Sequence, residues 1–216
     1  MREKNPLQAR KSRGNLFIVS APSGAGKTTL CKKLVSALPD LKFSVSYTTR
    51  RPREGEVNNS DYTFVGREDF RAMINRGEFI EWSEIHGELY GTSRKRLQEL
   101  VDLGNDVILD IDTQGATQLK EKSLEGTFIF ILPPSLEILR KRLESRLTES
   151  REDIEKRLKR AIAEIRTYAE YDYVIINNIL EQAIKELESV ILSQRVNART
   201  INHLWIEKFF LRQEVI

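Results

Sequence analysis

Residues 16–34 read LFIVSAPSGAGKTTLCKKL, and this stretch decides the fold. An apolar run ends in a loop of small residues, and a lysine and two threonines then open a helical pattern. Small side chains let backbone N–H groups point inward at an anion, and the N-terminus of a helix adds positive potential. The stretch therefore predicts a buried strand, a phosphate-binding loop and a helix, in that order.

The loop follows the pattern G-x-x-x-x-G-K-[ST], except that Ala21 replaces the first glycine. Glycines stay at positions 24 and 26, where the backbone must approach a phosphate closely. In this pattern the Lys27 side chain reaches the β- and γ-phosphates of a nucleotide, and the Thr28 hydroxyl binds Mg²⁺. We therefore expect an ATP-binding loop that works together with Mg²⁺.

A second sequence feature, VILDID at residues 107–112, supplies the acid that such a metal needs. The run ends at the carboxyl end of a buried strand, which faces the ligand crevice in an open α/β sheet. Asp110 is the stronger candidate for the metal. Asp112 points the same way if the strand continues, and either faces a second substrate or caps the helix that follows.

Apolar runs and helical patterns alternate along most of the chain. We expect strands at 16–21, 43–49, 105–112, 127–132 and 171–177, and helices at 27–38, 113–122, 135–145, 151–169 and 179–193. Near-continuous apolar runs are typical of parallel strands covered on both faces. The alternation predicts an α/β fold with a parallel sheet flanked by helices.

Two segments interrupt this alternation. Residues 50–92 combine polar stretches, short strand-like runs and one helix, which predicts an inserted α+β lobe at about 45–99. Residues 140–160 form a second, charge-dense insertion. We expect a basic tail at 1–13, a domain at 14–193 whose core comprises 14–44 and 100–193, and a helical extension at 194–216. The apolar stripe of that extension favours packing on the body or on a second subunit.

Composition limits the class of protein. The 216 residues are 40% hydrophobic, enough for a sizeable core, and the longest apolar runs are too short to span a bilayer. The N-terminus lacks the apolar segment of a signal peptide, and the single cysteine, Cys31, suits a reducing compartment. We therefore expect a cytoplasmic protein with no membrane partner. The basic tail lacks interleaved aromatic residues, so we expect no specific nucleic-acid partner.

The inserted lobe carries groups suited to a second phosphate. Arg50 and Arg53 lie in one short turn segment, and guanidinium groups bind phosphate through a planar fork. Tyr62 and Tyr90 can add hydroxyl donors.

The same lobe carries groups suited to a base. The Glu81 carboxylate matches the N1 and N2 donors of guanine, and the Ser46 and Thr92 hydroxyls match its O6. Adenine would leave the buried carboxylate unpaired, and such a penalty gives strong discrimination. On residue type alone, surface polar groups are an equally good interpretation.

The segments FSVSYTTRRPREGE (43–56), DYTFV, FIEW, YGTS and ILDIDTQG occur in this order, and together they resemble the bacterial-type guanylate kinases over roughly residues 15–193. The resemblance implies transfer of the γ-phosphoryl group of ATP to GMP, and to dGMP, in guanine nucleotide synthesis. It implies a GMP site at Ser46, Arg50, Arg53, Tyr62, Glu81, Tyr90, Thr92 and Asp112. It implies an ATP site at Ala21, Pro22, Ser23, Gly24, Ala25, Gly26, Lys27, Thr28, Thr29 and Asn177.

The resemblance also makes residues 140–160 a mobile lid that closes over ATP. Lid arginines would offset charge on the transferred group, so the implied catalytic set is Lys27, Arg50, Arg142, Arg146 and Arg157. Thr28 and Asp110 would hold Mg²⁺, partly through water. Two positions depart from the family: Leu147 replaces a usual glycine, and Asn178 replaces a usual aspartate.

No general base is expected, because a phosphate monoester is already an anionic nucleophile near neutral pH. Neither His86 nor His203 lies in the matching motifs. Two rival interpretations remain: a kinase of another nucleoside monophosphate, and a peptide-binding scaffold of the guanylate-kinase-like type. The base-reading set argues against the first, and the intact Gly26-Lys27-Thr28 against the second. Whether the protein forms a homo-oligomer stays open.

Overall fold

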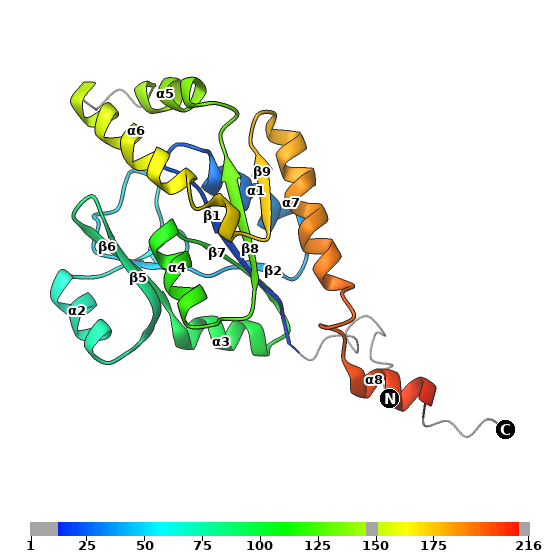
Figure 1. Cartoon of the computed structure of the whole chain (residues 1–216). Helices are drawn as coiled ribbons and strands as arrows, with labels where there is room; N and C mark the ends of the chain where they lie inside the picture. Colours follow the sequence, from blue (N-terminus) through cyan, green and yellow to red (C-terminus); the bar gives the residue numbers. More distant parts are fainter. Residues whose placement is uncertain (1–12, 146–150, 212–216) are drawn as a thin grey trace.

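The computed structural model describes residues 13–145 and 151–211, and a five-stranded parallel sheet forms its centre (Figure 1). The strand order is β2-β7-β1-β8-β9, so β1 lies between β7 and β8. All neighbouring strands pair in parallel. The strands are β1 (Leu16–Ser20), β2 (Leu41–Phe43), β7 (Asp106–Asp110), β8 (Thr127–Leu132) and β9 (Tyr173–Ile176).

Helices cover both faces of this sheet, as the sequence predicts. Side chains alternate along β1, so Phe17 and Val19 pack on one face and Ile18 on the other. The first face is covered by α1 (Lys27–Ala37) and α7 (Leu180–Arg195). The second is covered by α3 (Arg94–Asp102) and α4 (Thr113–Glu121). Because the loops after β1 and β7 open at the same edge, the phosphate loop and the predicted acids lie together.

A second, four-stranded sheet forms the inserted lobe between β2 and β7, with the order β4-β3-β6-β5. Its strands are β3 (Tyr47–Thr48), β4 (Thr63–Phe64), β5 (Phe79–Ile85) and β6 (Glu88–Ser93). Helix α2 (Arg67–Asn75) packs on this sheet through Phe70, whose ring stacks on Phe79 with centroids 4.5 Å apart.

The predicted strand at 43–49 is wrong as a single element. Phe43 ends β2 in the core sheet, whereas Tyr47 and Thr48 form β3 in the lobe sheet. Phe43 packs against the core, but the Tyr47 ring contacts Phe79 of the lobe with centroids 5.8 Å apart. The chain therefore crosses from one core to the other within a few residues, and an apolar pattern alone does not mark the crossing.

Helices α5 (Leu136–Glu144) and α6 (Arg151–Ile165) lie above the ends of the core strands (Figure 1). They pack together through Leu139, Leu143, Ile154, Leu158 and Ala161. The predicted helix at 151–169 is α6 followed by a short 3-10 turn, Tyr168–Glu170. Arg146 and Leu147 fall outside the described residues.

The extension after α7 contains α8 (His203–Ile206) and a π-helical turn, Glu207–Leu211. Several of its apolar side chains are exposed, among them Leu204, Phe209, Phe210 and Leu211. In the described ranges, no helix has the length and apolar character needed to cross a membrane.

Candidate active site

The loop between β1 and α1 depends on glycine for its shape. Gly24 and Gly26 have φ values of 93° and 90°, in the left-handed region that favours glycine. A Cβ on Gly26 would lie 2.5 Å from Nδ2 of Asn177. That amide group donates a hydrogen bond of 2.8 Å to the carbonyl oxygen of Ala25. Asn177, which directly follows β9, therefore holds the loop in place.

Arg142 on α5 contacts the same loop. Its guanidinium group donates to the carbonyl oxygens of Ala25 at 3.2 Å and Asn177 at 3.0 Å. Of the other predicted lid arginines, Arg157 on α6 donates to the Ser23 hydroxyl at 2.5 Å. Arg146 lies outside the described residues. Two helices of the predicted lid thus contact the phosphate loop directly.

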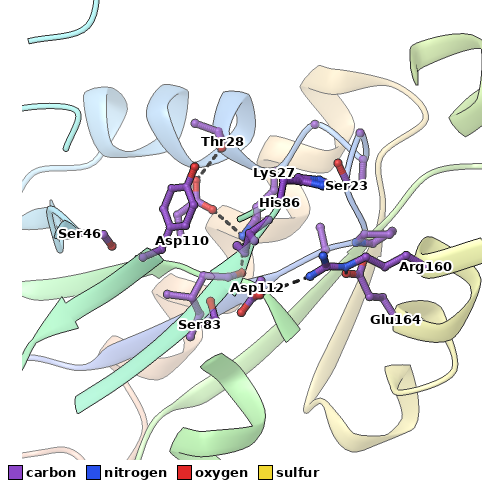
Figure 2. A pocket seen from close by; sticks show the side chains of 18 of the residues that line it. Ser23, Lys27, Thr28, Ser46, Ser83, His86, Asp110, Asp112, Arg160 and Glu164 are labelled. Carbon is purple, nitrogen blue, oxygen red and sulfur yellow. Dashed lines mark hydrogen bonds and ion pairs between the residues drawn. The ribbon is translucent and has the colours of Figure 1, made fainter. Parts of the chain in front are cut away.

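Asp110 at the end of β7 joins the two polar residues that open α1 (Figure 2). Its carboxylate accepts a hydrogen bond of 2.8 Å from the Thr28 hydroxyl and lies 2.6 Å from Nζ of Lys27. Lys27 also donates to the carbonyl oxygen of Ile111. Hydroxyl and carboxylate oxygens suit Mg²⁺, which is usually held by one or two protein groups together with substrate phosphates and water. No cluster of three or more histidine, cysteine or acidic side chains that could hold a metal occurs in residues 13–145 and 151–211.

A cavity of about 330 Å³ separates the loop from the lobe. Residues 21–29 form one wall, and predicted residues from elsewhere complete it, namely Ser46, Arg53, Tyr62, Glu81, Tyr90, Asp110, Asp112 and Arg157. A neighbouring cavity of about 300 Å³ includes Arg50 and shares Thr28, Ser46, Arg53, Tyr62, Tyr90 and Asp110. Thr92 is fully buried and lies opposite Glu81 in the β5–β6 pair. The structure thus brings most of the predicted ATP and GMP residues to two adjoining cavities, and Thr92 lies beside them.

Glu81 is the buried acid of this cavity, with only 3% of its surface exposed. The pKa of Glu81 is raised to about 7, chiefly because the carboxyl group is buried; contact with Thr92 lowers this pKa and the negative charge of Asp112 raises it. The first turn of α4 comes close, because a Cβ on Gly115 would lie 2.4 Å from Oε2 of Glu81. The Glu81 carboxyl group, with its raised pKa, therefore lies against Gly115, where a larger residue would not fit.

Asp112 caps the helix that follows it, one of the two roles that the sequence left open, and it also lines the cavity. Its Oδ1 caps α4 by accepting a hydrogen bond of 2.8 Å from the backbone N–H of Gly115. The residue also lines the cavity next to the loop. One carboxylate oxygen thus fixes the helix while the side chain faces the ligand space.

The two predicted phosphate-binding arginines of the lobe share an acid that sequence reasoning missed. Glu56 accepts from Arg50 Nη2 at 2.8 Å and from the backbone N–H of Arg53 at 2.7 Å. The ion pair lowers the pKa of Glu56 and raises that of Arg50. The Arg50 guanidinium group also lies 5.4 Å from the centre of the Tyr62 ring. The position of Glu56, three residues after Arg53 in a turn segment, could have indicated this contact from the sequence.

Four further polar cavity residues were missed, namely Ser83, His86, Arg160 and Glu164. Ser83 is two residues after Glu81 on the same strand and therefore shares its face. Arg160 and Glu164 follow Arg157 by three and seven residues, a spacing that places all three on one side of α6. His86 lies in the tight turn between β5 and β6 with φ 52°, and nothing in its sequence spacing indicates the cavity.

The glycine loop between a buried strand and a helix, with a lysine, a threonine and an acid at the next strand end, defines a P-loop nucleotide-binding enzyme. The family model described as guanylate kinase matches residues 13–194. The guanylate kinase of Geobacter metallireducens is 50% identical over 199 residues, which cover 92% of this chain and 98% of that protein.

The guanylate kinase of Clostridioides difficile is 45% identical over 197 residues, covering 91% of this chain and 96% of that protein. The crystal structure of guanylate kinase from Anaplasma phagocytophilum superposes with a TM-score of 0.77 at 35% identity, covering 95% of this chain and all of that one. The chain belongs to the guanylate kinase family and is a kinase of this class.

Proposed function

We propose that this enzyme transfers the γ-phosphoryl group of ATP to GMP, giving ADP and GDP, through the cavity between the P-loop and the inserted lobe. One observation carries the proposal. The Lys27, Thr28 and Asp110 cluster and the buried Glu81 carboxyl group line the same cavity. Groups suited to phosphate and metal therefore face a group suited to a base.

On the ATP side, the backbone of residues 21–29 binds the phosphates, and Lys27 neutralises charge on the β- and γ-phosphates. Thr28 and Asp110 would hold Mg²⁺, partly through water, and the ion would offset phosphate charge. Asn177 fixes the loop from the direction of the adenine. Arg142 acts through its hydrogen bonds to the loop, whereas Arg157 and Arg146 stabilise the transferred group when the lid closes.

On the GMP side, Arg50, Arg53, Tyr62 and Tyr90 bind the monophosphate. Glu56 holds Arg50 in position, so little side-chain freedom is lost when the phosphate binds. Ser46, Glu81, Thr92 and Asp112 recognise the guanine base. A monophosphate with adenine or a pyrimidine leaves buried acceptors without donors, which makes its transition state costly. We extend the proposal to dGMP, which carries the same base and the same phosphate as GMP.

The chemistry needs positioning more than proton transfer. A GMP phosphate oxygen attacks the γ-phosphorus in line, and the bond from that phosphorus to the ADP oxygen breaks. Closure of the lid at 140–160 against the lobe at 45–99 excludes water, which would otherwise hydrolyse ATP. These segments belong to one domain, 14–193, and we place the enzyme in the cytoplasm, where both nucleotides occur.

A coupled assay of ADP release tests this proposal, with Mg-ATP and each of GMP, AMP, CMP and UMP. GMP should support turnover at least a hundredfold better than the others. Lys27→Ala should lose more than a hundredfold in kcat, because it removes a charge at the transferred group. Lys33→Ala is the matched control, since Lys33 is exposed on the same helix and does not line the cavity. Equal turnover of AMP, or an active Lys27→Ala enzyme, would refute the proposal.

A further inference from the structure

Three side chains on one side of α6, Arg157, Arg160 and Glu164, line the cavity. Figure 2 shows Arg160 and Glu164 on this helix, with Arg160 directed at Asp112. Arg157 reaches the P-loop through the Ser23 hydroxyl. One turn further, Nη2 of Arg160 lies 3.9 Å from Oδ2 of Asp112, which the proposed function assigns to GMP. Nε of Arg160 donates to Oε1 of Glu164 at 2.9 Å. One helix therefore contacts the ATP loop and an acid of the GMP site.

Two carboxylate oxygens beside Arg160 have no hydrogen-bond donor. Among the residues that the structure describes, Oδ2 of Asp112 and Oε2 of Glu164 are buried and accept no hydrogen bond. The side chains are only 12% and 11% exposed, and both line the cavity. A buried carboxylate oxygen without a donor is costly, so such oxygens mark places where a ligand donor fits.

Asp112 and Glu81 flank one point in the cavity wall. A Cβ on Gly115 would lie 2.4 Å from Oε2 of Glu81 and 3.4 Å from Oδ1 of Asp112. Two acids so close repel each other, and a neighbouring cation relieves that repulsion. Arg160 contributes this cation from α6, and Glu164 holds its guanidinium group by a hydrogen bond.

We infer that Arg160, held by Glu164, is a positioning residue of the GMP site that fixes Asp112 as an acceptor for a guanine N–H donor. The inference rests on the proposed function. Helix α6, which carries Arg157 next to the ATP loop, thereby also takes part in binding GMP. Arg160 acts through Asp112 and does not itself contact the transferred group.

The inference predicts a split between the two substrates. In Arg160→Gln, the KM for GMP at saturating ATP should rise about tenfold, and the KM for ATP at saturating GMP should change less than about twofold. Arg160→Lys keeps the charge and should recover part of the loss. Lys159→Gln, at the exposed neighbouring position on α6, should change neither value.

A double-mutant cycle tests whether Arg160 acts through Asp112. Asn retains the ability to cap α4, so Asp112→Asn alters the acceptor with the helix preserved. In that background Arg160→Gln should add less than about twofold to the KM for GMP. Glu164→Gln should raise the KM for GMP about threefold in the parent enzyme.

Each remaining outcome overturns the inference. A rise in the KM for ATP alone would reassign Arg160 to the ATP site. Equal rises for both substrates, with a lower Tm, would show a structural role for the ion pair. If Arg160→Gln raises the KM for GMP by the same factor with and without Asp112→Asn, Arg160 does not act through Asp112. A parent enzyme without GMP turnover would instead refute the proposed function, so the two failures are distinguishable.

Discussion

Glu81 connects burial to substrate choice at the scale of a single residue. The carboxyl group is 3% exposed, and burial raises its pKa to about 7, from an ordinary value of 4.5. An ionised carboxylate accepts hydrogen bonds from guanine, whereas a protonated one offers a donor where an acceptor is needed. The free enzyme is therefore divided between two protonation states near neutral pH.

This pKa predicts that the Kd for GMP depends on pH. As pH falls from 8.5 to 6.5, Glu81 becomes protonated and the Kd should rise about fourfold. Calorimetry between pH 6.5 and 8.5 stays above the pKa of the GMP phosphate, near 6. The Kd for an ATP analogue is the internal control and should stay flat. A flat GMP profile would show that Glu81 does not bind the base as an anion.

The same pKa makes a prediction about folding stability. Folded Glu81 binds a proton more tightly than unfolded Glu81, so its contribution to the free energy of unfolding falls as pH rises from about 4.5 to about 7. Urea unfolding at pH 5 and pH 7.5 gives the change in the free energy of unfolding between the two pH values. The decrease from pH 5 to pH 7.5 should be about 1–3 kcal/mol smaller in Glu81→Gln than in the parent enzyme, because glutamine does not titrate. An identical pH dependence in both proteins would contradict the burial argument.

At the scale of elements, the residues of the P-loop itself indicate the loop, whereas Asn177 and Arg142 were implied only by the family resemblance, and their hydrogen bonds to the loop were not predicted. A buried strand, small residues and Gly-Lys-Thr specify the loop locally, so the sequence alone indicates it. The hydrogen bond from Asn177 and those from Arg142 come from residues more than a hundred positions away. Likewise, α6 was expected as a helix, but the approach of its Arg160 to Asp112, at the start of α4, depends on the tertiary fold and cannot be predicted from sequence spacing.

Gly26 tests whether the loop needs both its backbone angle and its open space. Gly26→Ala would place a methyl group 2.5 Å from Nδ2 of Asn177 at a φ of 90°. We expect the KM for ATP to rise more than tenfold and stability to fall by about 1–3 kcal/mol. Gly104→Ala is the control, because Gly104 has a φ of 82° but no atom within 4 Å of the added Cβ. Equal effects of the two substitutions on ATP binding would contradict the steric argument.

At the scale of the whole molecule, alternating apolar runs were enough to predict the parallel sheet and the inserted lobe. They failed where the chain passes from Phe43 in one sheet to Tyr47 in the other, because both residues carry aromatic rings and each is half-buried against its own core. Asp106 shows another limit. This fully buried carboxylate binds Arg195 at 2.7 Å and joins α7 to β7, a contact that sequence spacing does not encode.

The extension beyond α7 should matter little for the fold of the body. Leu204, Phe210 and Leu211 are 71%, 63% and 71% exposed, so the described part of the extension buries little of their surface. A chain that ends at Asn197 should keep its kcat/KM within about twofold and its Tm within about 2 °C. A large drop in Tm on truncation would reveal packing by the extension.

By contrast, Arg195→Ala in the full chain should lower the free energy of unfolding by about 2 kcal/mol, because it removes the charge beside buried Asp106.

We propose that Glu81 selects the base of the nucleotide that receives the phosphoryl group from ATP at the P-loop. The most direct test compares kcat/KM for GMP with that for AMP in the parent enzyme, in Glu81→Gln and in the exposed β5 control Glu84→Gln. The account predicts that the ratio falls at least a hundredfold in Glu81→Gln, through loss of GMP turnover, and stays unchanged in Glu84→Gln. An unchanged ratio in folded Glu81→Gln would contradict the account.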